Sequence, residues 1–202
     1  MRAILLPVLV VALAACQGTV PPPRPITPPT AAPPPTATPA PTAAVQGRDG
    51  VACVGAVIKP PQGLAEAHDD ALLAKAVDVT GKGKLCTGKV FEAQGKVTVY
   101  RVWNVAKDYT ALGSWWSFST PAGPVASYRA DNAICPEWSE LNRVSSCRIK
   151  VGARVVVGPG QSAACEHEVT YPKSATNQVF IPNDTRAGQV FVEDCTPGAP
   201  WP

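Results

Sequence analysis

The side chains that most often catalyse hydrolysis are scarce in this sequence. It contains two histidines, His68 among charged residues and His167 between Glu166 and Glu168. A Ser or Cys nucleophile needs a histidine beside it as a base, and the neighbours of His68 and His167 do not indicate that role for either histidine. No GxSxG, P-loop or GxGxxG motif occurs. A pair of carboxylates acting on a glycosidic bond stays open as an alternative, but nothing in the sequence singles out one pair of acids.

Six cysteines remain when Cys16, near the N-terminus, is set aside. An even number of cysteines in an exported chain indicates disulfide bonds. The sequence does not fix their pairing, although the short separation of Cys135 and Cys147 favours that pair as a local bridge. Zinc is the alternative, but no CxxC occurs, and Cys165 with His167 supplies only two of the four ligands that structural zinc needs. We therefore expect no metal, and disulfides among Cys53, Cys86, Cys135, Cys147, Cys165 and Cys195.

Three segments in the second half of the chain carry a distinctive order of residue types. Residues 99–103 read Val, Tyr, Arg, Val, Trp, residues 113–121 read Gly, Ser, Trp, Trp, Ser, Phe, Ser, Thr, Pro, and residues 177–183 read Asn, Gln, Val, Phe, Ile, Pro, Asn. This order resembles the ADP-ribosyltransferase toxins of the Arg-Ser-Glu class. Their landmarks are an Arg ending the first strand, an aromatic-Ser-Thr-Ser strand, and a Glu-x-Glu strand leading into Leu-Ile-Pro. The sequence is more similar still to the divergent toxin domains of bacterial polymorphic toxins, over about half of the chain.

The resemblance implies that the domain binds NAD and cleaves the bond between nicotinamide and ribose. Arg101 would then hold a phosphate through two parallel hydrogen bonds, which suits a guanidinium. Ser117 or Ser119 would orient this Arg and the ribose, while Trp115, Trp116 and Trp103 would form an aromatic wall for the nicotinamide ring. The interpretation that needs no ligand is a surface Arg on a strand next to tryptophans of the core.

Gln178 stands where the family carries its catalytic Glu, with Thr176 two residues before it. A Gln oxygen accepts a hydrogen bond from a ribose hydroxyl but brings no negative charge to the oxocarbenium ion, and losing one such group costs on the order of 10² to 10³ in rate. A second register places Glu168 in this role, because residues 166–172 read Glu, His, Glu, Val, Thr, Tyr, Pro. We prefer Gln178, since residues 176–181 are richer in strand-forming types, and keep Glu168 as the alternative.

Hydrophobic spacing predicts the elements that position these residues. Residues 64–77 have the hydrophobic periodicity of a helix, and a short helix with Pro at its first turn is expected over residues 124–133. β-branched and aromatic runs separated by turn residues predict strands. Their expected ranges are 97–103, 115–119, 147–157, 176–181 and 189–193. This order indicates an α+β domain, for which the resemblance implies a split β-sheet core with few helices, here stapled by disulfides.

The N-terminus is typical of an exported, lipidated protein. Arg2 precedes a short apolar stretch, and together they predict a signal peptide over residues 1–15. Residues 13–16 read Leu, Ala, Ala, Cys and resemble the lipobox of bacterial lipoproteins, in which the cysteine is acylated with fatty acids such as palmitate. The resemblance implies that Cys16 is the lipidation site. It also implies anchoring at the outer membrane, because Gln17 rather than Asp follows the cysteine.

Composition separates a spacer from a domain. Residues 16–47, which begin with the lipidated Cys, are mostly Pro, Thr and Ala, so they bury too little apolar surface to fold and are expected to form an extended linker. A Pro-rich recognition ligand is the alternative, but Arg24 is its only basic flank. Residues 48–202 are expected to form one globular domain. The net charge is only +3 and the sequence has no long run of Lys and Arg, so it does not indicate a surface that binds nucleic acid.

Two functions follow as expectations. The first is a toxin-like, lipid-anchored envelope protein whose NAD-binding domain transfers ADP-ribose to a protein acceptor or hydrolyses NAD, with NAD as the substrate and no metal. The alternative is a non-enzymatic envelope lipoprotein of the same fold that binds a protein or glycan partner. The membrane is a partner of both through the lipid, and nucleic acid is a partner of neither.

Overall fold

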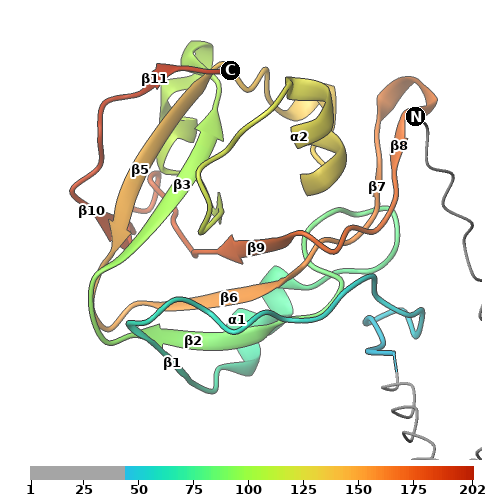
Figure 1. Ribbon diagram of the computed structural model, residues 1–202, viewed down its shortest axis with the longest axis horizontal. Helices are drawn as coiled ribbons and strands as arrows, with labels where there is room; N and C mark the ends of the chain where they lie inside the picture. Colours follow the sequence, from blue (N-terminus) through green and yellow to red (C-terminus); the bar gives the residue numbers. More distant parts are fainter. Residues whose placement is uncertain (1–43) are drawn as a thin grey trace, which may run out of the picture. The chain divides into compact units, whose positions relative to one another are not determined.

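The computed structural model describes residues 44–202 (Figure 1). The predicted signal peptide, Cys16 and most of the predicted linker lie outside the described residues. Antiparallel sheets make up most of the regular secondary structure in the described residues, and α1 (Asp70–Ala76) and α2 (Val125–Asn132) are short α-helices. The fold is therefore mixed α/β with sheet predominating, and it has three disulfides. No helix within residues 44–202 is long and apolar enough to cross a membrane.

The larger sheet has five strands in the order β1-β2-β6-β9-β4, with every neighbouring pair antiparallel. Its middle strand β6 is a run of valines, Val155 to Val157, and all three are fully buried because both faces of the sheet are covered. The strands are β1 (Leu64–Glu66), β2 (Lys89–Ala93), β4 (Trp115–Trp116), β6 (Arg154–Pro159) and β9 (Asn177–Phe180).

The second sheet is built around β5. β3 pairs with β5 over its full length, while β10 and β11 pair with β5 along its other edge. The two sheets meet at residues 115–117, because β4 pairs with β9 whereas Ser117 forms a bridge to Tyr100 of β3. A small hairpin of two strands completes the sheets. The ranges are β3 (Val97–Trp103), β5 (Arg143–Ile149), β10 (Val192–Glu193) and β11 (Ala199–Pro200), and β7 (Ala163–Ala164) with β8 (Thr170–Tyr171) in the hairpin.

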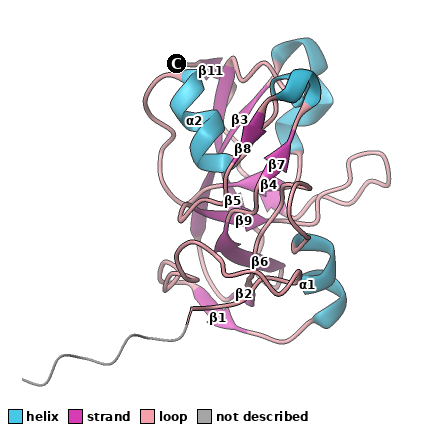
Figure 2. Cartoon of the chain, turned by 90° about the vertical axis from the view of Figure 1, so that its right-hand side faces the viewer, coloured by secondary structure: helices cyan, strands magenta, loops and turns pink. Residues whose placement is uncertain are grey.

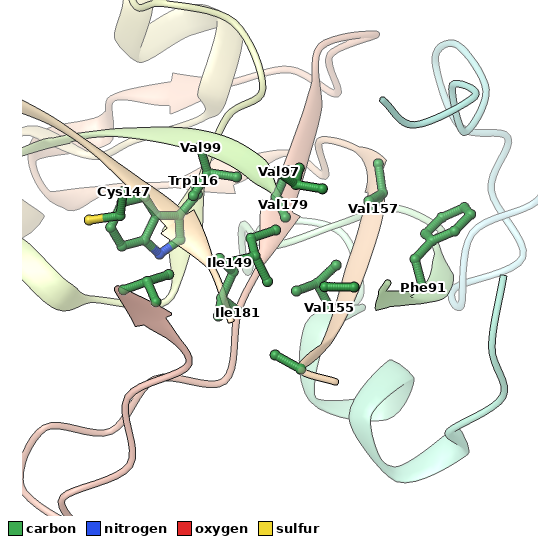
Figure 3. Close-up of a cluster of buried hydrophobic side chains, with 13 residues drawn as sticks. Phe91, Val97, Val99, Trp116, Cys147, Ile149, Val155, Val157, Val179 and Ile181 are labelled. Carbon is green, nitrogen blue, oxygen red and sulfur yellow. The ribbon is translucent and has the colours of Figure 1, made fainter. Parts of the chain in front are cut away.

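The main hydrophobic core draws on both sheets (Figure 3). Alternation along the strands sends successive side chains to opposite faces, so Val155 and Val157 join this core while Val156 packs under α1. A third cluster packs α2 against β3 and β5 through Val102, Leu141 and others. The labelled core residues are Phe91, Val97, Val99, Trp116, Cys147, Ile149, Val155, Val157, Val179 and Ile181.

The helix predicted over residues 64–77 is shorter than expected. Leu64–Glu66 forms β1, which pairs with β2, and the helix begins at Asp70 because the Asp69 carboxylate accepts a hydrogen bond from the Leu72 amide at 2.9 Å. The apolar positions at 64 and 67 that suggested a longer helix belong to the strand and to the segment after it. Figure 2 shows α1 next to β2 and β6, and α2 at the other sheet.

The second predicted helix is confirmed as α2. Pro124 lies at its N-cap, and Ala133 ends it in the left-handed conformation. The described chain also contains three short 3₁₀ segments, and the first and the third are kinked. They are η1 (Val105–Leu112), η2 (Pro136–Trp138) and η3 (Glu166–Glu168).

Each predicted strand region contains a strand, but the bounds of the observed strands differ from the predicted ones in several places. β3 has the predicted bounds, and β9 and β10 lie within the predicted ranges. The strand expected over 147–157 is two strands, because Gly152 adopts a positive φ in a turn between β5 and β6. The strand expected over 115–119 is reduced to β4 and the Ser117 bridge.

The cysteines form disulfides as predicted, but the predicted Cys135–Cys147 pair is wrong. Cys147 lies on β5 and pairs with Cys195, because β10 returns antiparallel alongside β5 just before that residue. Cys135 pairs with Cys165, which joins the end of the α2 segment to the β7–β8 hairpin. Spacing along the chain favoured a local bridge, whereas the sheet topology separates the two residues. The third bond joins Cys53 to Cys86.

Candidate functional site

A cavity of about 160 Å³ brings together residues from β3, β4, β9 and the segment after β4. We call it the Arg101 cavity. It contains four of the residues that the sequence predicted for a site. Its lining residues are Lys84, Arg101, Val102, Trp115, Trp116, Tyr128, Asn132, Ala133, Ile134, Trp138, Ser139, Leu141 and Gln178.

Arg101 extends from β3 and is held by backbone carbonyl groups. Its Nε donates to the Thr110 oxygen and its Nη1 to the Trp115 oxygen, both at 2.7 Å. Its guanidinium carbon lies 6.0 Å from the ring centroid of Trp116, within cation–π range. No carboxylate in residues 44–202 forms an ion pair with it. Burial lowers the pKa of Arg101 to about 10, so it is protonated at neutral pH.

Tyr128 of α2 places a phenol in the same cavity. Burial raises the pKa of Tyr128 to about 12, against the opposing effect of the positive charge on Arg101. The hydroxyl is therefore protonated at neutral pH. No described residue forms a hydrogen bond with this hydroxyl, so it can donate to a ligand.

Gln178 of β9 offers a neutral acceptor. Its side chain is 6% exposed, and its Nε2 donates to the Asn132 oxygen at 3.1 Å. Its Oε1 accepts from no donor in the described chain, yet no side-chain nitrogen or oxygen that is fully buried there lacks a partner. The Oε1 atom is therefore accessible. Because Gln178 lines the Arg101 cavity, we expect this oxygen to be reached from the cavity.

Three tryptophans give the cavity its aromatic character. Trp115 packs on Phe180 with ring centroids 5.0 Å apart, and Trp116 is buried with its Nε1 donating to the Gly113 oxygen at 2.7 Å. Trp138 is 48% exposed, so one side of it lines the cavity and the other faces solvent. A flat ring could pack against these faces.

Ser117, Ser119 and Glu168 do not line the Arg101 cavity. The Ser117 hydroxyl donates to the Ser119 oxygen at 2.7 Å, which uses it locally. Glu168 is exposed and lies in η3, where His167 and Glu168 both have positive φ, so this Glu-x-Glu segment is a turn and not a strand. The structure thus brings together Arg101, Trp115, Trp116 and Gln178 without these three.

Sequence reasoning missed the wall formed by residues 128–141. Arg129 braces this wall by donating from Nη1 to the carbonyl oxygens of Ile134 and Cys135, and the Cys135–Cys165 disulfide fixes it to the β7–β8 hairpin. The sequence signal was the predicted α2 helix, but no motif marked Tyr128 or Trp138.

The charges around the cavity are positive. Among residues 44–202, Lys84 and Arg101 are the only charged residues that line it, and the Lys84 ammonium pairs with Asp78 at 3.0 Å. One group of potential metal ligands occurs in the described residues, Cys135, Glu137 and Cys165, but the two sulfurs are bonded to each other. Only the Glu137 carboxylate remains, which is insufficient for a structural metal site.

Comparison with protein-family models, with curated proteins and with solved structures finds no match to this chain. The function is therefore argued from the cavity itself.

Proposed function

We propose that this protein is a lipid-anchored envelope protein whose domain binds a ligand with a planar ring and an anionic group in the Arg101 cavity. The observation that carries the proposal is a half-buried guanidinium that faces aromatic walls and pairs with no carboxylate in the described chain. A cation taken partly out of water without a counter-ion is costly, and an anionic ligand removes part of that cost. The lipobox-like residues 13–16 support the lipid anchor.

NAD is the first ligand to test. Arg101, Trp115, Trp116 and Gln178 are the residues that the resemblance assigns to NAD, and they line one cavity. The cavity volume of about 160 Å³ is close to that of an engineered cavity of about 150 Å³ that holds benzene. The cavity therefore encloses a single ring, and the remainder of a dinucleotide would extend outside it.

Cleavage of NAD is the second candidate function, and Gln178 favours it. Its Oε1 is available to a ribose hydroxyl, while Arg101 supplies a positive charge for phosphate. No Asp or Glu of the described residues lines the cavity. Turnover would then proceed without a carboxylate at the ribose, at a rate lower by on the order of 10² to 10³ than with one.

Ligand-dependent thermal unfolding of the full, oxidised chain tests the proposal. NAD, nicotinamide mononucleotide, ADP-ribose and soluble cell-wall glycan fragments are each titrated. A ligand at a hundredfold excess over Kd stabilises the fold by about 2.7 kcal/mol. Arg101→Lys keeps the charge but loses the planar fork, so it should weaken binding at least tenfold. Arg148→Lys is the matched control, because Arg148 pairs with Asp194 away from the cavity.

Two results would overturn binding at this cavity: no ligand of the series raises the midpoint, or Arg101→Lys binds as the wild type does. Stabilisation by glycan fragments alone would favour the non-enzymatic alternative over NAD. Nicotinamide release from NAD then tests turnover. Gln178→Ala should abolish release, and Glu168→Ala should leave it unchanged because Glu168 does not line the cavity.

A further inference from the structure

A second hollow, of about 240 Å³, also reaches Arg101, and the inference drawn from it rests in part on the function proposed above because both use this guanidinium. It lies between η1 and the segment that follows β9. We call it the Arg186 hollow. Its lining residues include Arg101, Tyr109, Gly113, Asn183, Asp184 and Arg186.

Arg186 is presented by a tight turn. Asp184 and Gln189 exchange backbone hydrogen bonds of 2.7 and 2.8 Å, and the Asp184 carboxylate accepts from the amides of Arg186 and Ala187 at 3.1 Å. The Arg186 guanidinium carbon lies 5.8 Å from the ring centroid of Tyr109. Within residues 44–202 this guanidinium has neither a hydrogen-bond acceptor nor an ion-pair partner, so its donors are available to a ligand.

Arg101 contributes a second guanidinium to the hollow. A Cβ at Gly113 would overlap its Nη2 atom, so the absence of a side chain at Gly113 lets this nitrogen lie against the backbone that lines the hollow. Nε and Nη1 donate to carbonyl oxygens, whereas Nη2 has no acceptor among the described residues. Because fully buried nitrogens there all have partners, Nη2 retains accessible surface.

The charges in the hollow do not balance. Two arginines line it, and Asp184 is the only acidic residue of the described chain that does so. One oxygen of that carboxylate is already engaged by two backbone amides. Like charges that face the same hollow repel, and an anion between them relieves the repulsion. The guanidinium fork matches the oxygens of phosphate and carboxylate groups.

We propose that the Arg186 hollow is an oxyanion-binding site, with Arg186 and the Nη2 atom of Arg101 as its two cationic groups. A phosphorylated or a carboxylated ligand would supply the same chemistry. The site does not depend on which ring the Arg101 cavity accepts.

The test measures thermal unfolding of the full, oxidised chain in inorganic phosphate, in malonate and in chloride at equal ionic strength. Phosphate or malonate should raise the midpoint saturably above chloride, and the arm with the lower Kd identifies the preferred oxyanion. Arg186→Gln should raise that Kd at least tenfold and Arg186→Lys less, because Lys keeps the charge without the fork. Lys96→Gln is the control, since it removes the same charge from an exposed turn between β2 and β3.

The proposal is overturned if neither anion gives a saturable rise, or if Arg186→Gln binds the anion as tightly as the wild type. Arg186 is exposed, so its variants should fold, which the midpoint in chloride checks. Nicotinamide, which carries no oxyanion, reports on the Arg101 cavity alone. Its binding should be the same in Arg186→Gln and wild type, so failure of one site is distinguishable from failure of the other.

Discussion

Removing the Cys135–Cys165 disulfide should destabilise the protein and loosen one wall of the Arg101 cavity. The bond closes a loop with a sequence separation of 30 residues. The chain-entropy model for such a loop gives about 12 cal/mol/K, which corresponds to about 3.6 kcal/mol at 25 °C. Residues 132–141 supply six of the cavity's lining residues and are anchored by this bond. Cys135→Ala/Cys165→Ala should therefore lower the free energy of unfolding by that amount and speed amide exchange over 132–141.

The Cys147–Cys195 bond provides the matched control. Its separation of 48 residues gives a loss of about 4 kcal/mol in the same model, and neither cysteine lines the cavity. Urea unfolding of Cys147→Ala/Cys195→Ala should show a comparable loss, with exchange over 132–141 unchanged. The reasoning is refuted if removing Cys135–Cys165 costs less than about 1 kcal/mol. It is equally refuted if both double variants speed exchange over 132–141 to the same extent.

Two further perturbations probe the buried site and the sheet. The alkaline titration of phenol absorbance should contain a component with a pKa of about 12 that Tyr128→Phe removes. The unfolded phenol ionises near pH 10, so between about pH 10 and 12 the wild type should lose stability relative to Tyr128→Phe; identical profiles would contradict the burial. Gly158→Ala should cost about 1–3 kcal/mol or more in urea unfolding, because its Cβ would overlap the Thr87 carbonyl oxygen. Gly95→Ala, whose Cβ meets only Gly63 at 3.8 Å, should cost much less, and equal losses would refute the overlap.

The strands predicted best from the sequence are those with unbroken β-branched and aromatic runs. In the first half of β3, Val97 and Val99 point into the main core and alternate with Thr98 and Tyr100, so the period of two is visible without any neighbour. β2 was not predicted, because Glu92 and Ala93 interrupt the strand-forming run of Lys89–Ala93. Its burial arises from pairing with β1 on one side and β6 on the other. Such pairing is tertiary information that composition does not carry.

The residues of the candidate site also differ in whether the sequence could predict them. Arg101 and Gln178 could be named in advance because the resemblance pointed to the strands on which they lie. Tyr128 and Trp138 could not, because their place in the cavity depends on how the segment after α2 folds back. That fold is set partly by the pairing of Cys135, and spacing along the chain predicted the wrong partner for it.

The presence of Gln178 where the resemblance implies a Glu is consistent with the surroundings of Arg101. A carboxylate in the cavity would pair with the guanidinium and compete with an anionic ligand. The described structure instead orients Arg101 with the carbonyl oxygens of Thr110 and Trp115, which leave its full charge in place. Gln178 is likewise held through its Nε2 and presents a neutral oxygen. Keeping a half-buried charge uncompensated lowers stability, and costly groups of this kind occur preferentially at functional sites. The arrangement therefore favours anion binding over a structural ion pair as the reason for an Arg at this position.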